Sequence, residues 1–183
     1  MVDSRNSMAD RMLLARRVIQ PGVLVTLRAY LKFRAFVSPR AEVELGPNLQ
    51  LGRGTTIGSF SKVKSAAGPL WIGQRVDVGA GVFISPGEAG IRIGDDCLIS
   101  PHVSITGSNY RYELLDQTFR EQGHSSAGIR IGANVWLGAG SRILDGAEIG
   151  SGVIVSPNAV VSGRIAENSI VQGDPGRVVF QRR

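Results

Sequence analysis

A six-residue repeat of aliphatic side chains constrains this chain more than any other feature of its sequence. From residue 131 onward, six consecutive repeats place Ile, Leu or Val at every sixth position. An α-helical face repeats near every 3.6 residues, and six residues are too few for a hairpin meander. The period therefore predicts a solenoid of short strands joined by corners. The repeat positions are Ile131, Leu137, Ile143, Ile149, Val155 and Val161.

The upstream half carries the same repeat in three separate runs. Glycine follows many of the aliphatic residues, as Gly52, Gly73 and Gly132 show, and we expect the Gly, Asn or Asp after an aliphatic residue to form the corner at positive φ. A second residue able to sit inside follows each aliphatic by four positions. Three hexads would close a coil of eighteen residues, and stacked coils would align parallel strands about 4.8 Å apart. The runs are Leu45, Leu51, Ile57 and Val63; Ile72, Val78 and Ile84; and Ile93, Ile99 and Ile105.

One long break separates the two halves, because Ile105 and Ile131 are twenty residues farther apart than one hexad. We predict an all-β fold, a parallel β-helix over residues 41–165 with an inserted loop at 107–128. Residues 1–40 are expected to form an N-terminal helical cap, and residues 166–183 a C-terminal tail or cap. The length of 183 residues suits one domain with a sizeable core.

The N-terminal region is strongly basic, with seven Arg or Lys residues in a thirty-residue stretch that holds no acid. Leu24, Leu27 and Leu31 recur at helical spacing, and Pro21 separates this helix from an earlier one near Met12 to Ile19. We expect both helices to pack on the body of the protein; the alternative is a membrane-surface helix with basic flanks. Aromatic residues at stacking spacing are absent, which disfavours nucleic acid as a partner. The basic residues are Arg11, Arg16, Arg17, Arg28, Lys32, Arg34 and Arg40.

Cys97 is the single cysteine, so an internal disulfide is excluded. It stands at an inward position of the repeat, and we expect it to fill the core rather than act as a nucleophile. The N-terminus does not match an export signal, and no apolar run approaches the roughly 20 residues of a membrane helix. We therefore expect a cytoplasmic protein, at the inner face of the membrane if the N-terminal helices bind lipid.

The segment IGANVWLGAGSRILDGAEIGSGVIVSPNAVVSGRIAENSIVQGDPGRVV, which begins at Ile131, resembles the hexapeptide-repeat acyltransferases. The similarity is greatest to the branch that contains sugar and polysaccharide O-acetyltransferases, and it extends from Leu45 to Val179. The resemblance implies a left-handed parallel β-helix and a homotrimer. It also implies active sites between neighbouring subunits, where acetyl-CoA and an acceptor bind.

Transfer of an acetyl group to a sugar hydroxyl requires a base with a pKa near neutrality, and histidine fits best. In the resembled branch, the inserted loop carries a catalytic histidine directly after an asparagine. Here that place reads Asn109-Tyr110. A tyrosine, with a pKa near 10, is a poor base, although its hydroxyl can donate to an oxyanion or an acceptor. Either His124 in the same loop takes the role, or the activity is altered and the chain is a non-catalytic scaffold or binding protein.

Several neighbouring side chains bear on these alternatives. Glu121 and Asp116 are candidates to orient the ring of His124. His102, outward and near a corner, is expected to be a surface or subunit-contact residue and is the reserve candidate for the base. Tyr110, Tyr112 and Phe119 form either an aromatic wall for the acceptor or a small core of the loop itself.

The resemblance also assigns residues to the acetyl-CoA site. A lysine that is frequent in the family directly after the position of Ser162 is replaced by Gly163, and Arg164 stands beside it. Arg177 lies in the final GDPGR segment, where a guanidinium suits the nucleotide phosphates. The implied donor-binding residues are Trp136, Gly138, Ala139, Ser156, Pro157, Ser162, Arg164 and Arg177.

These features predict an acetyl-CoA-dependent O-acetyltransferase that acts on a saccharide by direct attack in a ternary complex. Two histidines per chain do not supply the three-histidine zinc site of the carbonic anhydrases that share this fold, so no metal is expected. The forty residues before the repeat are too few for the long helical domain of serine acetyltransferases, and a nucleotidyltransferase domain is likewise absent.

Overall fold

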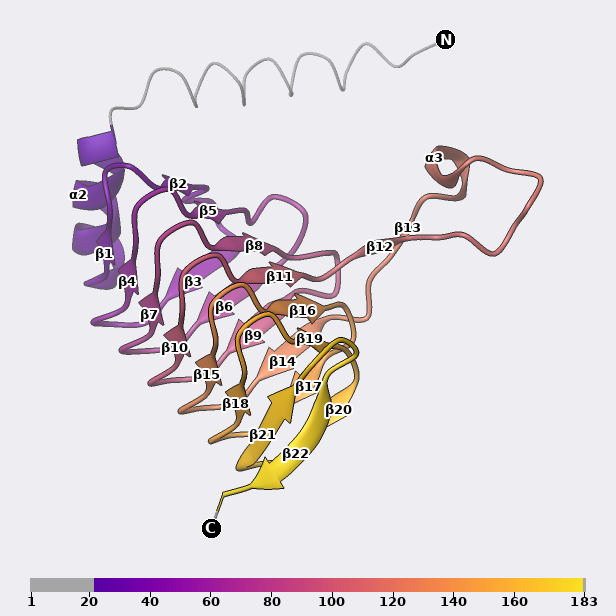
Figure 1. The fold of residues 1–183 in the computed structure, drawn as a ribbon. Helices are drawn as coiled ribbons and strands as arrows, with labels where there is room; N and C mark the ends of the chain where they lie inside the picture. The colour runs from indigo at the N-terminus through magenta and orange to yellow at the C-terminus, as the bar shows by residue number, and fades with distance from the viewer. Residues whose placement is uncertain (1–21, 183) are drawn as a thin grey trace, which may run out of the picture.

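The structure is a computed structural model that describes residues 22–182, in which α2 (Gly22–Phe33) leads into a stack of triangular coils (Figure 1). The predicted helix near Met12 to Ile19 lies outside the described residues. Each coil contributes one short strand to each of three parallel sheets, which we number 1 to 3 in the order in which a coil visits them.

Sheet 1 holds seven parallel strands and one antiparallel strand that covers the last coil. Sheets 2 and 3 hold six parallel strands each. The strands of sheet 1 are β1 (Phe36–Val37), β4 (Thr56–Ile57), β7 (Asp77–Val78), β10 (Leu98–Ile99), β15 (Trp136–Leu137), β18 (Ile154–Val155), β21 (Ser169–Gln172) and the antiparallel β22 (Arg177–Gln181). Those of sheet 2 are β2 (Glu42–Val43), β5 (Lys62–Val63), β8 (Phe83–Ser85), β11 (Ser104–Thr106), β16 (Arg142–Leu144) and β19 (Val160–Val161). Those of sheet 3 are β3 (Leu49–Leu51), β6 (Leu70–Ile72), β9 (Ile91–Ile93), β14 (Ile129–Ile131), β17 (Glu148–Ile149) and β20 (Arg164–Ile165).

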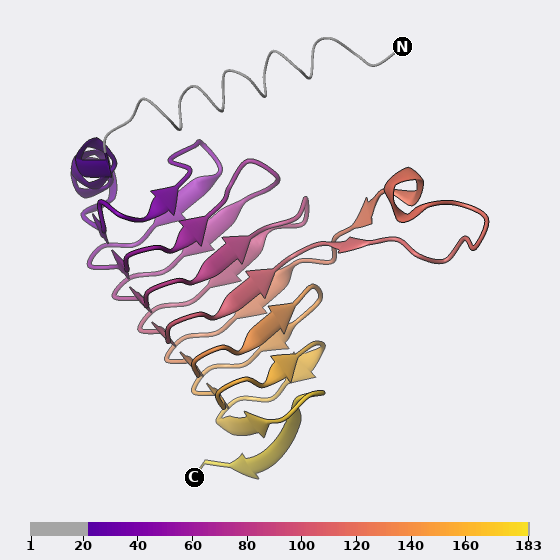
Figure 2. The ribbon, with the colours of Figure 1, turned by 45° about the horizontal axis from the view of Figure 1, so that its top comes forward.

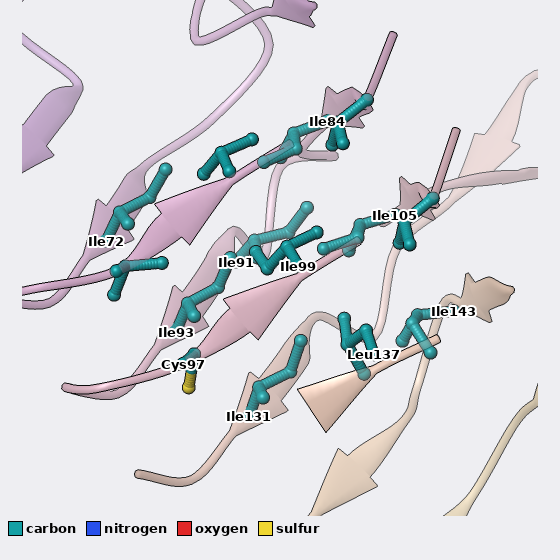
Figure 3. Close-up of a cluster of buried hydrophobic side chains, with 14 of the residues drawn as sticks. Ile72, Ile84, Ile91, Ile93, Cys97, Ile99, Ile105, Ile131, Leu137 and Ile143 are labelled. Atoms are coloured by element: carbon teal, nitrogen blue, oxygen red, sulfur yellow. The ribbon is translucent and has the colours of Figure 1, made fainter. Parts of the chain in front are cut away.

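The repeat positions form the core, as predicted. Every aliphatic residue of the repeat from Leu51 to Val161 is buried, whereas Leu45 is half-buried. Figure 3 shows the resulting column of side chains, in which Ile72, Ile93 and Ile131 lie on successive coils. Where the repeat is uninterrupted, the residues four positions after the aliphatic are also buried, Cys97 among them, whereas those after Val63, Ile84 and Ile105 are exposed. Burial raises the pKa of the Cys97 thiol, which is consistent with a core residue rather than a nucleophile.

The prediction for the corners was correct in residue type at many of them, since Gly54, Asp96 and Asn134 have positive φ, but it was wrong for the glycine directly after the aliphatic residue. The glycine that directly follows an aliphatic residue does not have positive φ; that conformation belongs to the residue two positions later, such as Gly54, Arg75 or Asn134. The glycine is needed instead because the next coil passes very close. A Cβ atom on Gly52 would lie 2.3 Å from the carbonyl carbon of Gly73. Close coil stacking therefore explains this part of the repeat.

The predicted coil length of eighteen residues was also wrong for the first half of the chain. Thr56 pairs with Asp77, 21 positions later, whereas Trp136 pairs with Ile154, 18 positions later. The additional residues all lie at the corner between sheets 2 and 3, which we call the variable corner. The other two corners keep the same length from coil to coil, and we call them the tight corners. The coils consequently narrow toward the C-terminus (Figure 2).

The ends of the stack extend beyond the expected boundaries of the repeat. β1 lies within residues 1–40 and β21 within residues 166–183, and both pair in parallel in sheet 1. Helix α2 packs beside β1 through the buried Ala29, and Thr26 Oγ1 donates to the carbonyl oxygen of Val37 at 2.6 Å. At the other end, β22 folds back along β21 as an exposed antiparallel strand at the edge of sheet 1.

Candidate active site

The inserted loop at 107–128 leaves the body of the protein at the variable corner, between β11 and β14, and we call it the arm (Figure 2). Its outgoing and returning segments pair as the antiparallel strands β12 (Asn109–Tyr110) and β13 (His124–Ser125). The short helix α3 (Phe119–Gln122) lies near its tip. The long break in the repeat is therefore an ordered hairpin that projects away from the coils.

The structure brings together two residues that the sequence separates by fourteen positions. Tyr110 and His124 are directly opposite each other across β12 and β13, and their ring centroids are 4.2 Å apart. The two planes are inclined by 41°, and both side chains are exposed. An imidazole that can accept a proton thus lies beside a phenol that can donate a hydrogen bond. The two predicted catalytic side chains form one pair on one face of the arm.

The predicted carboxylate partners of His124 are placed elsewhere. Glu121 Oε2 accepts hydrogen bonds from Thr118 N at 2.9 Å and from Thr118 Oγ1 at 2.8 Å. These bonds lower the pKa of the Glu121 carboxyl and attach it to the start of α3. Within residues 22–182, no hydrogen bond or ion pair joins His124 to Glu121 or Asp116. Tyr110, rather than an acid, is the side chain in contact with the His124 ring.

Two polar residues that the sequence reasoning missed hold the base of the arm. Ser126 Oγ donates to the carbonyl oxygen of Gly107 at 2.7 Å and accepts from Ala89 N at 3.1 Å. The Asp145 carboxylate, on the following coil, accepts from the backbone N–H groups of Ala127 and Gly128 at 2.8 to 3.0 Å. Asp145 lies at the same corner as the base of the arm, one coil later. Once the residues are assigned to coils, this position identifies Asp145 as a neighbour of the arm.

The apolar side chains of the arm do not form a core of its own. Tyr112 is 70% exposed, Leu115 is 99% exposed and Phe119 is 65% exposed. The arm is held instead by polar contacts, since the Gln122 side chain bonds to the backbone N–H and carbonyl oxygen of Leu114 at 2.9 Å each. Of the two interpretations, the small core is excluded, and the aromatic wall remains a prediction.

Most of the predicted donor residues gather at the tight corner between sheets 1 and 2. Trp136 Nε1 donates to Ser100 Oγ at 3.0 Å, and the Trp136 side chain is 46% exposed. Gly138 and Ala139 follow it, and Ser156 and Pro157 occupy the same corner of the next coil, where Asn158 N donates to the carbonyl oxygen of Ala139.

His102 lies at this same corner, on the preceding coil. It is exposed, and its φ of 61° is that of the other corner residues. Its backbone N–H bonds to Ala80, and the backbone N–H of Gly140 bonds to Pro101 beside it. The reserve histidine is therefore adjacent to the predicted donor residues, while His124 is on the arm at a different corner.

Two of the remaining donor residues lie apart from this group, because Ser162 and Arg164 are exposed at the variable corner and on sheet 3. Arg177 begins β22 opposite Gln172, at the end of sheet 1 that leads into the same tight corner, one coil beyond Ser156. One chain does not bring Arg164 or His124 to the corner of Trp136 and Gly138. Among residues 22–182, no group of three or more His, Cys, Asp or Glu side chains could hold a metal ion, and no helix is long and apolar enough to cross a membrane.

Two family models match the chain in its coils. Residues 128–163 match the model described as bacterial transferase hexapeptide (six repeats), and residues 69–106 match the hexapeptide repeat of succinyl-transferase. The topology and these matches together confirm the predicted fold class, a left-handed parallel β-helix.

Curated proteins of similar sequence are acetyltransferases by name. The chain is 29% identical to a probable acetyltransferase of Mycobacterium tuberculosis over 93% of its own length, but it spans only 61% of that relative. It is 28% identical to WbbJ of Escherichia coli, a putative lipopolysaccharide biosynthesis O-acetyl transferase, with 91% of this chain and 85% of WbbJ covered.

A solved structure shares the fold at lower sequence identity. AntD, an N-acyltransferase from Bacillus cereus solved in complex with dTDP and 3-hydroxybutyryl-CoA, superposes with a TM-score of 0.72 at 21% identity. The match covers 82% of this chain and 81% of AntD. At this identity the similarity establishes the fold.

Proposed function

We propose that this chain, which matches hexapeptide-repeat models at residues 69–106 and 128–163, transfers an acetyl group from acetyl-CoA to a hydroxyl of a saccharide acceptor. The observation that carries this proposal is the Tyr110–His124 pair on the arm. It supplies a proton acceptor where the family's catalytic histidine is replaced by tyrosine. The CoA ligand of AntD and the O-acetyltransferase name of WbbJ support the donor and the reaction class.

In the proposed reaction, the imidazole of His124 takes the proton of the acceptor hydroxyl as its oxygen attacks the thioester carbonyl carbon. A tetrahedral intermediate forms, and the Tyr110 hydroxyl donates a hydrogen bond to its oxyanion. The C–S bond then breaks, the acetyl ester is released, and the imidazolium returns its proton to the departing CoA sulfur. No acyl-enzyme is formed, so donor and acceptor must be bound together.

We propose that the active protein is a homotrimer with its sites between subunits. His124 and the donor corner lie at different corners of one chain, so an arm must reach the donor corner of a neighbour to complete the site. The outward residues of sheet 1 support such a contact, because Leu98, Trp136, Ile154 and Ile170 form an apolar row in register. Leu98 is 52% exposed in the single chain. A mass of three chains in analytical ultracentrifugation is the expected result, and a monomer with full activity would contradict it.

In this arrangement the donor residues divide into two groups. Trp136, Gly138, Ala139, Ser156 and Pro157 would line the pantetheine slot along one tight corner. The positively charged Arg164 and Arg177, with Ser162, would contact the phosphates.

The test compares three single substitutions in the full-length protein. We expect His124→Ala to abolish acetyl transfer and Tyr110→Phe to lower turnover about a hundredfold, the usual effect of removing one oxyanion donor. His102→Ala is the control, since the proposal gives that residue no chemical role. All three variants should keep the wild-type mass and be stabilised by CoA.

The opposite results are equally informative. Wild-type turnover in His124→Ala with loss of turnover in His102→Ala would assign the base to the tight corner. Absence of any thermal stabilisation of the wild type by CoA would favour the non-catalytic scaffold, because a ligand that binds the native state must raise its apparent stability.

We also propose that this protein is cytoplasmic and contacts the inner face of the membrane through α2. The helix exposes an apolar face made by Leu24, Leu27 and Leu31, with Arg28 and Lys32 at its border. Apolar surface flanked by cations is typical of helices that bind anionic bilayers. The protein should sediment with phosphatidylglycerol vesicles, and Leu27→Glu should remove this binding, whereas Leu115→Glu on the arm should not. Sedimentation of both variants like the wild type would contradict the proposal.

A further inference from the structure

The outer face of sheet 3 carries a row of polar and aromatic side chains that the proposed function does not use in full. Successive strands place these outward residues in register, so each one is the direct neighbour of the next. The row contains three arginines and one glutamate. From the N-terminal coils onward it is Gln50, Trp71, Arg92, Arg130, Glu148 and Arg164.

Two adjacent arginines of this row contact different neighbours: Arg92 contacts the preceding coil and Arg130 the following coil. The Arg92 guanidinium stacks over the Trp71 ring, 3.5 Å from its centroid, and Arg130 Nη1 forms an ion pair with Glu148 Oε1 at 2.6 Å. Stacking on an indole fixes a guanidinium plane while leaving its N–H edge available. Within residues 22–182, no carboxylate pairs with Arg92.

Like charges in direct register on neighbouring strands repel each other. Arg92 and Arg130 are such a pair, since Arg92 on β9 is the register partner of Arg130 on β14. An anion between the two guanidinium groups would convert this repulsion into two charge-assisted interactions. Glu148 already pairs with Arg130, so Arg92 is the member of this pair for which the described residues supply no carboxylate partner.

A hollow of about 420 Å³ lies at this place, a volume within the range typical of small-ligand sites. Trp71, Arg92 and Arg130 line one side of it. The lining also includes small residues of the variable corner that lead into β9 and β14, and these leave the backbone accessible to a ligand: Ala89, Gly90, Ala127 and Gly128. Ala127 and Gly128 are also the base of the arm, so the hollow adjoins the element that carries His124.

We infer that this hollow binds an anionic sugar unit of the acceptor, with its carboxylate or phosphate held between Arg92 and Arg130. The inference rests on the proposed function and specifies the acceptor: a saccharide that bears an oxyanion near the hydroxyl to be acetylated. Trp71 acts as a positioning residue, because it holds the Arg92 guanidinium flat and directs its N–H edge into the hollow.

The experiment measures binding of three small probes to the full-length protein by saturation-transfer NMR and calorimetry. The probes are methyl glucuronide, glucose 1-phosphate and the neutral methyl glucoside. We expect the anionic probes to bind at least tenfold more tightly than methyl glucoside, and Arg92→Ala to lower their affinity about tenfold. Binding of only one anionic probe would still support the site and would identify the anion as carboxylate or phosphate.

Arg142→Ala is the matched control, because Arg142 is an exposed outward arginine on sheet 2. Equal losses in Arg92→Ala and Arg142→Ala would show only a general effect of positive charge and would overturn the inference. Equal affinity for methyl glucoside and the two anions would overturn it as well. Trp71→Leu should weaken the anionic probes while leaving methyl glucoside unchanged, which a purely structural role of Trp71 would not do.

Coenzyme A is the second control, because its phosphates are an alternative anion. The dissociation constant for CoA should be the same in the wild type and in Arg92→Ala. A weaker affinity for CoA, with unchanged affinity for the sugars, would assign the arginines to the donor and reject the acceptor site. These are binding measurements, so their failure would leave the His124→Ala result intact, and loss of the catalytic proposal would leave the probe affinities intact.

Discussion

The tight corners and the variable corner of this β-helix are built from the same chain but differ in what they tolerate. At the tight corner after β3, a Cβ on Gly52 would lie within 2.4 Å of three backbone atoms of the next coil. At the variable corner after β2, a Cβ on Gly46 would meet only Ser65 Oγ, at 3.5 Å. The tight corners keep one length from coil to coil, and the variable corner accepts added residues. The coils also approach closely at parts of the variable corner, since a Cβ on Gly68 would lie 1.9 Å from the carbonyl oxygen of Gly87. The candidate base and the proposed acceptor hollow both lie at the corner that is free to vary.

The largest effect should come from restoring the variable corner to its ordinary length. Deletion of residues 109–125 leaves five residues between Thr106 and Ile129, as many as residues 86–90 provide one coil earlier. We expect complete loss of acetyl transfer, since the deletion removes Tyr110 and His124 together. The midpoint of chemical denaturation should change little, because the deleted segment contributes no buried side chain to the core.

Unfolding of the deletion variant under native conditions would show that the arm stabilises the coils. That result would also contradict the view that residues inserted at the variable corner do not contribute to the stability of the coils. Retained acetyl transfer would remove His124 from the mechanism altogether.

The next effect compares Gly52→Ala with Gly46→Ala. Each glycine directly follows a leucine of the repeat, so the sequence gives no reason to distinguish them. Overpacking against the backbone of the next coil should lower the free energy of unfolding of Gly52→Ala by about 3 kcal/mol. Gly46→Ala should remain within about 0.5 kcal/mol of the wild type. Equal destabilisation in urea titrations of both variants would contradict the difference in clearance between these two positions.

The core of this fold could be predicted from the sequence because one inward aliphatic per hexad is a direct consequence of the coil geometry. The corners were less predictable. The interruptions after Val63, Ile84 and Ile105 are visible as breaks in the repeat, but only the register shows that all three belong to the same corner. The glycines were assigned to the wrong cause, since proximity of the next coil leaves no mark in a single hexad.

The candidate site was predictable in part, for a similar reason. The pairing of Tyr110 with His124 depends on the register of a hairpin whose strands hold two residues each, and such short strands carry no usable pattern. The row on sheet 3 did leave a signal. Trp71, Arg92 and Arg130 each directly precede an aliphatic residue of the repeat, so they share one outward position on successive coils.

An intermediate effect is expected from the residue that joins the arm to the variable corner. Asp145→Ala removes the carboxylate that accepts from the Ala127 and Gly128 N–H groups. Bonds to a charged acceptor contribute about 1.5 to 3 kcal/mol, so hydrogen exchange at the base of the arm should accelerate at least tenfold. Exchange in the coils should not change, and Asp145→Asn should restore part of the protection. Unchanged exchange at residues 126–128 would show that Ser126 alone is sufficient.

The smallest effect concerns an exposed ion pair at a tight corner. Asp96 Oδ1 and Oδ2 accept from Arg75 Nε at 2.6 Å and Nη2 at 2.8 Å, and these bonds lower the pKa of the Asp96 carboxyl. A carboxyl whose pKa is lowered by folding stabilises the native state above its ordinary pKa, near 3.8, and this contribution is lost as the pH falls through the lowered value. Asp96→Asn tests this directly, since asparagine also tolerates the positive φ of 58° at this corner.

The difference between wild type and Asp96→Asn should be small at pH 7, because both partners are exposed and water screens their attraction. It should shrink further as the pH falls below about 4 and should also shrink at high salt. Denaturation midpoints measured at pH 7, 5 and 3.5 check the sign. A difference that grows toward acid pH would mean that the Asp96 carboxyl is stabilised in its protonated form, contrary to the bidentate geometry with Arg75. Even complete loss of this pair should leave the coils stacked, because the backbone bond from Asp96 N to the carbonyl oxygen of Gln74 joins the two coils at this same corner.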